Sequence, residues 1–250
     1  MAFYAYCLLR LKTDEPWPVL EGIDQHPVFP LRCGKYTMLL SRLDRNFPFT
    51  MRSIVEHGQV ISRVFETHTV LPMRFSTFFR SEKQIANLIL ENQKELLEAF
   101  CRLRGKAEMR LKLLCPSGAL KPGTEQTPSL AASAAGNNYS NGTNGTLDPR
   151  SQSTANRLAE QVSEMFRPLE QQMSCRLNRS RELLVDCAHL IESEKVEKYQ
   201  KVYSTASGHL KEWDLRLSGP WPPYHFLPTS VRLPAPVAAP TRRRVSVGLR

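Results

Sequence analysis

The sequence predicts an α+β protein, in which strands of a mainly antiparallel sheet pack against helices. Two observations predict this class. Segments that are apolar or alternate between apolar and polar residues, as strands do, are interleaved with segments whose apolar residues recur every three or four positions, as in helices. The order strands, helix, strand, helix, strand in the first half of the chain favours a sheet with helices packed on one face. With 41% apolar and 23% charged residues among 250, the composition excludes a wholly disordered or collagen-like chain.

Composition also predicts the domain organisation. Residues 1–115 form one α+β domain and residues 153–227 a second, and we expect both to have a ferredoxin-like arrangement. Between them, residues 116–152 are of low complexity and carry too little apolar surface to offset the entropy of ordering, which predicts a flexible linker. Residues 228–250 hold five arginines and no acidic residue, half of the net charge of +10, and are expected to form a disordered Pro/Arg-rich tail.

In the first domain, proline, glycine and capping residues indicate where the expected strands and helices begin and end. Pro72 cannot donate to a sheet, so its strand should end there or lie at an edge. Ser81 followed by Gln84 has the form of a capping box, and Gly105 is placed to end the same helix. The expected strands are 3–11, 36–43, 70–75 and 108–114, a short strand ends near Arg32 before a turn at Cys33-Gly34, and the expected helices are 52–66 and 81–104.

The second domain has a similar but shorter series of helices and strands. The expected helices are 156–166 and 193–210, and the expected strands are 183–191 and 212–217. Seven of the 18 prolines lie beyond residue 219, so we expect no regular element there. Gly219–Phe226 combines three prolines with a Trp, a Tyr and a Phe. Such a rigid aromatic segment either clamps elements together or presents a surface to a partner, and composition leaves both readings open.

Several short segments, taken in order along the chain, match one known pattern. Ser218–Phe226 is similar to a C-terminal signature, Thr-Gly-Pro-Trp-Pro-Pro-Tyr-Ser-Phe, and Val70–Phe79 is similar to a central Leu-Pro-Leu-Arg-Phe-Gly-Thr motif. Further matches are Tyr4–Tyr6, His57, Gly105–Glu108 and Leu184–Ile191. On these residues the chain resembles the gas vesicle protein GvpL/GvpF family. The departures are Ser76 for Gly, Asp186 for Asn, His189 for Tyr and His225 for Ser.

The resemblance implies a non-enzymatic accessory protein of gas vesicle formation, cytoplasmic and associated with the gas vesicle. It implies binding to the small apolar wall subunit of the vesicle, as a chaperone or as a minor shell component at nucleation, and to other gas vesicle accessory proteins. No cofactor is implied. Ser76 introduces a Cβ where glycine would suit a positive φ or close packing.

Two groups of residues are candidates for contact with a partner. Arg74, Phe75 and Phe78 end a strand, where exposed aromatics can dock an apolar partner; the alternative is that the phenylalanines, with Phe79, fill the core. The second group lies in the proline-rich segment and consists of Trp221, Tyr224 and Phe226.

Other classes of protein are disfavoured by what the sequence lacks. No signal peptide and no apolar run long enough to span a membrane stands out. The six cysteines have no paired spacing for a metal and indicate reduced thiols, with Cys7, Cys101 and Cys187 on apolar faces. Glu56 and His57 have no third titratable group at a mechanistic spacing, so we expect no catalytic residues. The remaining alternative is a small ligand- or nucleic-acid-binding regulator, weakly favoured by Arg242–Arg244.

Overall fold

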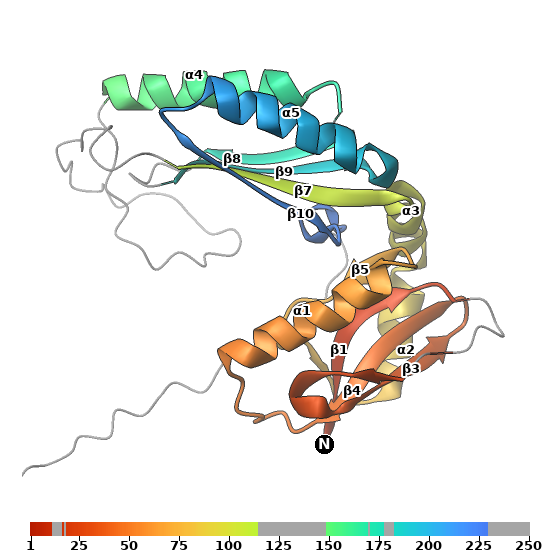
Figure 1. Cartoon of the computed structure of the whole chain (residues 1–250). Coiled ribbons are helices and arrows are strands. Elements are labelled where there is room, and N and C mark those ends of the chain that lie inside the picture. Colours follow the sequence, from red (N-terminus) through yellow and green to blue (C-terminus); the bar gives the residue numbers. More distant parts are fainter. Residues whose placement is uncertain (12–16, 18, 115–148, 170, 178–182, 230–250) are drawn as a thin grey trace, which may run out of the picture. The chain divides into compact units, whose positions relative to one another are not determined.

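The computed structural model describes residues 1–11, 17, 19–114, 149–169, 171–177 and 183–229. The chain divides into two compact units: unit 1 comprises Met1–Gly105 together with the chain from Pro222 onward, and unit 2 comprises Lys106–Trp221. Each unit is a mixed α+β structure with an antiparallel sheet, as the sequence predicts (Figure 1). Within the described residues, no helix combines the length and the apolar character that crossing a membrane requires.

Unit 1 is built on a six-stranded sheet in the order β2-β3-β4-β1-β5, with β6 paired to β1. All pairings are antiparallel. Its elements are β1 (Ala2–Leu9), β2 (Leu20–Glu21), η1 (Ile23–Gln25), β3 (Pro27–Cys33), β4 (Tyr36–Leu43), α1 (Met51–Phe65), β5 (Val70–Pro72), β6 (Phe78–Phe79), α2 (Glu82–Glu91), α3 (Gln93–Leu103) and η3 (Tyr224–Phe226). The predicted strand 36–43 is confirmed at both ends, and Pro72 ends an edge strand as expected.

Helices cover both faces of this sheet. On one face, Tyr6 and Leu39 pack with Val60 of α1 in a single core cluster. On the other, Tyr36 stacks on Phe100 of α3 with ring centroids 5.6 Å apart. The expectation of helices on only one face is therefore wrong for unit 1. The physical reason is that β1 and β4 are buried along almost their whole length, so both of their faces need a covering layer.

The predicted helix 81–104 is two helices. Ser81 caps the first, since its hydroxyl accepts a hydrogen bond from the Gln84 amide at 3.2 Å. The Gln84 side chain accepts from the Arg80 amide, one residue before the cap, so the predicted box is only half formed. Asn92 leaves the helical conformation (φ −118°) and its side chain donates to the Leu88 carbonyl at 2.7 Å. This local bond competes with the helical ladder and separates α2 from α3.

Unit 2 has the element order βαββαβ and the sheet order β10-β7-β9-β8, which is the ferredoxin-like arrangement. The ferredoxin-like expectation thus fits unit 2, whereas the β2-β3-β4 meander of unit 1 departs from it. The elements are β7 (Lys106–Leu114), α4 (Pro149–Phe166), β8 (Gln172–Leu177), β9 (Leu183–Glu192), η2 (Ser193–Lys195), α5 (Val196–His209) and β10 (Asp214–Trp221). Both helices lie on one face of the sheet (Figure 1).

The expected domain boundaries need revision at three places. The strand over 108–114 was expected to complete the first domain, but β7 pairs with β9 and β10 and is central to unit 2. Helix α4 begins at Pro149, inside the expected linker, and residues 115–148 lie outside the described residues. Strand β10 continues to Trp221 despite the prolines, and the chain rejoins unit 1 at Pro222. The expected tail lies outside the described residues from 230 onward.

The cysteines also differ from expectation. Cys7 is buried in the unit 1 core, as predicted. Cys101, expected on an apolar face, is exposed on α3. Cys187 is disulfide-bonded, so the expectation of a reduced thiol is wrong there. Its register partner on β8 is Cys175.

Ser76 is held in a conformation that favours glycine. Its φ is +65°, in the left-handed region, which costs an L-residue roughly 1 kcal/mol. We therefore expect Ser76→Gly to be more stable than Ser76→Ala by about 1 kcal/mol in urea unfolding, since both variants lack the hydroxyl and only alanine keeps the Cβ. Equal stability of the two variants would contradict this account of the position.

Candidate partner-binding surface

The six predicted contact residues separate into surface and core. Arg74, Trp221 and Tyr224 are exposed, and Phe75 is half-buried. Phe78 and Phe226 are buried, so they cannot meet a partner directly. Within unit 1, Phe78 packs edge-to-face on Tyr4, and the Phe226 carbonyl accepts a hydrogen bond from Arg102 of α3. For these two residues the structure supports the core reading rather than the contact reading.

An aromatic cluster lies at the N-terminal end of α1 and consists of Phe47, Phe49 and Phe75. The rings of Phe49 and Phe75 are 4.9 Å apart, and those of Phe47 and Phe49 are 5.3 Å apart, measured between centroids. All three side chains are half-buried. The buried ring of Tyr4 contacts both Phe49 and Phe75, so the cluster packs against the core of unit 1. The cluster is thus a firm, apolar surface with its edges open to solvent.

Helix α1, which follows Phe49 in the chain, also exposes apolar side chains. Met51, Ile54 and Val55 are 78%, 45% and 57% exposed, large fractions for apolar side chains. Gly58 lies on the same side of the helix, and a Cβ added there would meet nothing within 4 Å. We call these four residues the apolar face of α1. The sequence alone does not distinguish this face, because Ile54 follows the same helical spacing as the buried Ile61.

A hydrogen-bond network fixes this end of α1 on the sheet. The Met73 carbonyl can only accept, so His57 Nε2 carries the proton and donates to it at 3.2 Å. Nδ1 then accepts from the Tyr4 hydroxyl at 2.8 Å, and that hydroxyl accepts from the Ser76 amide at 3.3 Å. Burial lowers the pKa of His57 to about 4 and raises that of Tyr4. His57 is therefore a neutral structural residue that sets the position of Phe75, whose ring it contacts.

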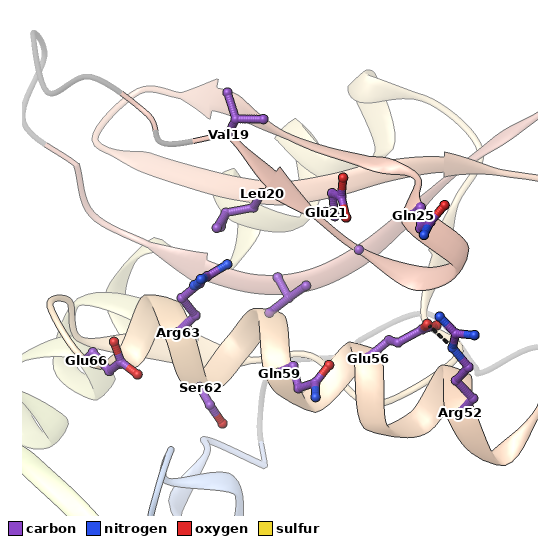
Figure 2. Close-up of a pocket in the computed structure, with 12 residues that line it drawn as sticks. Val19, Leu20, Glu21, Gln25, Arg52, Glu56, Gln59, Ser62, Arg63 and Glu66 are labelled. Atoms are coloured by element: carbon purple, nitrogen blue, oxygen red, sulfur yellow. Dashed lines mark hydrogen bonds and ion pairs between the residues drawn. The ribbon is translucent and has the colours of Figure 1, made fainter.

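Glu56 lies on a different side of α1 and lines a cavity of about 720 Å³ between α1 and the segment Val19–Gln25 (Figure 2). Its carboxylate accepts from the Asp24 amide at 3.0 Å and from Arg52 Nε at 2.7 Å. The Asp24 amide and Arg52 together hold its pKa below the usual range. Because Glu56 faces this cavity while His57 is buried against Tyr4, the two neighbours do not form an acid–base pair.

The C-terminal signature segment has a definite structural role. Ser218 pairs with Arg110 and Trp221 with Glu108, so Gly219 and Pro220 together oppose one residue of β7 and form a bulge. The Gly219–Pro220 peptide is cis and Gly219 has φ +119°. Pro222 and Pro223 are buried, whereas Trp221 and Tyr224 are exposed. The segment thus forms a bulge in unit 2 and carries two exposed aromatic side chains, Trp221 in unit 2 and Tyr224 in unit 1.

Comparison with known proteins decides the family. The sequence matches the family described as "Gas vesicle synthesis protein GvpL/GvpF" over residues 2–228, which is most of the chain. The chain belongs to the GvpL/GvpF family. Among curated relatives, gas vesicle protein F1 of Halobacterium salinarum is 20% identical over 213 residues (83% of this chain and 85% of the relative). Gas vesicle protein F2 of the same organism is 22% identical over 181 residues (71% and 69%).

Solved structures of GvpF proteins support the fold. The crystal structure of GvpF from Microcystis aeruginosa aligns with a TM-score of 0.71 at 16% identity, covering 91% of this chain and 99% of that one. GvpF from Anabaena sp. PCC7120 aligns with a TM-score of 0.69 at 16% identity, covering 92% and 99%. Membership of the GvpL/GvpF family gives this protein a role in gas vesicle formation.

Proposed function

We propose that this protein is a non-enzymatic assembly factor that binds the small apolar wall subunit of the gas vesicle in the cytoplasm, before or during shell formation. The observation that carries the proposal is the surface of unit 1 formed by the aromatic cluster and the apolar face of α1. Water-exposed apolar surface of this kind marks a docking site for an apolar partner. Aromatic side chains, phenylalanine among them, are enriched at the centre of protein interfaces.

The physical role follows from the chemistry of the subunit. An apolar subunit aggregates unless its apolar face is covered, and a complementary surface on a carrier removes that face from water. Burial of apolar area favours the complex by at most roughly 25 cal/mol per Å², and part of this gain is offset by the lost translational and rotational freedom of the two proteins. Arg74, exposed next to Phe75, would lie at the edge of this contact. Other gas vesicle accessory proteins are proposed as further partners.

The test is co-expression of the tagged full-length protein with the wall subunit, followed by pull-down and by measurement of the subunit in the supernatant. The wild type should retain the subunit and keep it in solution. Met51→Glu/Val55→Glu places two charges on the apolar face of α1 and should reduce the retained subunit at least five-fold, because each charge would have to be desolvated. The variant should melt like the wild type, since both side chains are exposed.

Leu90→Glu provides the matched control. Leu90 is also a large exposed apolar residue of unit 1 (66% exposed), but it lies on α2. It should retain the subunit as the wild type does. Equal loss in both variants would point to a general effect of surface charge, and no retention by the wild type would reject wall-subunit binding altogether.

A further inference from the structure

A groove of about 710 Å³ lies between α4 and α5 in unit 2. Its floor is apolar and is formed by Met165 of α4 and by Val202, Ala206 and Leu210 of α5. Ala206 and Leu210 are buried in the core, but Met165 and Val202 remain half-buried although the two helices pack side by side (Figure 1). The volume is in the range that accommodates several side chains of a ligand.

The lysines that line this groove give its rim a positive charge, beside the uncharged Gln161 and Thr205. Lys198 and Lys201 both line it from α5, one turn apart, and no carboxylate is among its described lining residues. The nearby acidic residues of the two helices, Glu160, Glu164 and Glu197, do not line it. An apolar floor with a rim of one charge sign is complementary to apolar side chains flanked by carboxylates.

The shape favours a helical occupant. A helix laid into a groove between two helices presents residues i, i+3, i+4 and i+7 to the floor, and its flanking positions meet the rim. Methionine suits such a floor because its flexible thioether adapts to the side chains of a partner. The chain's own terminal segment 228–250 does not fit, because its five arginines would be repelled by the two lysines.

We propose that this groove binds an amphipathic helix of a partner protein, with apolar residues on the floor and Asp or Glu side chains paired to Lys198 and Lys201. The groove belongs to unit 2 and the surface proposed for the wall subunit belongs to unit 1. Loss of helix binding by unit 2 would therefore leave the proposal of wall-subunit binding by unit 1 untouched, and the reverse also holds. The groove would give the protein a second partner, with an acidic amphipathic helix.

The test uses the full-length protein and two fluorescent 18-residue helical peptides. Both carry leucines at i, i+3, i+4 and i+7, and they differ only in having glutamates or lysines at the flanking positions. At low salt the Glu peptide should bind at least ten-fold more tightly than the Lys peptide in fluorescence anisotropy. Lys198→Glu/Lys201→Glu should reverse this order, and Val202→Asp should weaken both peptides. Lys83→Glu/Lys94→Glu, an identical charge change at exposed sites of unit 1, should leave the order unchanged.

Several outcomes would overturn the proposal. These are equal binding of the two peptides, a preference unchanged in Lys198→Glu/Lys201→Glu, and binding that emerges only when residues 230–250 are removed, which would assign the groove to the chain's own tail. Competition by anionic lipid vesicles as effective as that by unlabelled Glu peptide would assign it to a membrane surface. If the glutamate variant does not fold by circular dichroism, Lys198→Gln/Lys201→Gln should abolish the preference, and a preference retained there would also reject the proposal.

Discussion

Gly219→Ala is expected to destabilise unit 2 by on the order of 3 kcal/mol. A Cβ at this position would lie 2.7 Å from the backbone oxygen of Glu108, closer than real Cβ contacts allow, and the φ of +119° is unfavourable for any L side chain. Since Glu108 O belongs to the neighbouring strand β7, relief of the clash requires β10 to move away from its pairing partner. Changes of this size come from steric conflict with fixed backbone rather than from lost surface contacts.

Thermal unfolding followed by tryptophan fluorescence measures this effect, because Trp213 and Trp221, two of the three tryptophans, belong to unit 2. Gly208→Ala is the matched control. It makes the same change in the same unit, in α5, where an added Cβ meets nothing within 4 Å. It should stabilise the helix by roughly 0.5–1 kcal/mol. Similar melting of the two variants would show that the bulge tolerates a side chain.

Stability is expected to fall steeply as the pH drops from about 6.5 to 4. Burial lowers the pKa of His57 in unit 1 and of His189 in unit 2 from 6.5 to about 4. In this window the unfolded chain binds the protons and the folded chain does not, so each histidine contributes stability that is complete above pH 6.5 and is lost toward pH 4. A pKa shift of this size corresponds to roughly 3 kcal/mol of unfolding free energy per histidine. This stability is lost gradually as the pH falls through the window.

Urea unfolding at pH 7.5, 6.5, 5.5 and 4.5 tests this prediction. His57→Gln should be less stable than the wild type at pH 7.5, because the bond from Tyr4 to Nδ1 is lost, but its stability should fall less between pH 6.5 and 4.5. His209→Gln, at an exposed position of α5, should keep the wild-type slope. A His57→Gln slope equal to that of the wild type would mean that the protonation of His57 is not coupled to folding.

Local sequence patterns predicted most elements but not their partners. Strand β4 and helix α1 were predicted to within a residue because apolar periodicity and flanking turn residues are local signals. The expected strand 108–114 is also confirmed as β7, which begins two residues earlier, at Lys106. Its local pattern carried no information on which sheet β7 joins, and the low-complexity segment that follows it resembled a domain boundary. Its pairing with β9, a strand far along the chain, places β7 in the sheet of unit 2.

The candidate surface shows the same limit. The sequence drew attention to Arg74 and Phe75, which do lie at the surface, but it could not tell them from Phe78, which faces Tyr4 in the core. Arg74 and Phe75 lie between β5 and β6, whereas Phe78 lies in β6, and only the tertiary structure shows which of these side chains is covered. The apolar face of α1 was missed for a related reason. Its four residues border the buried stripe, so a one-dimensional pattern merges the two.

Unit 1 is assembled from two separate stretches of the chain, with unit 2 inserted between Gly105 and Pro222. During synthesis the ribosome therefore produces all of unit 2 before it releases Phe226, a buried residue of unit 1 whose carbonyl bonds to Arg102. Unit 2 can fold while unit 1 still lacks its last segment. A nascent chain stalled after Trp221 would thus carry a complete unit 2 together with a unit 1 that still lacks its last segment.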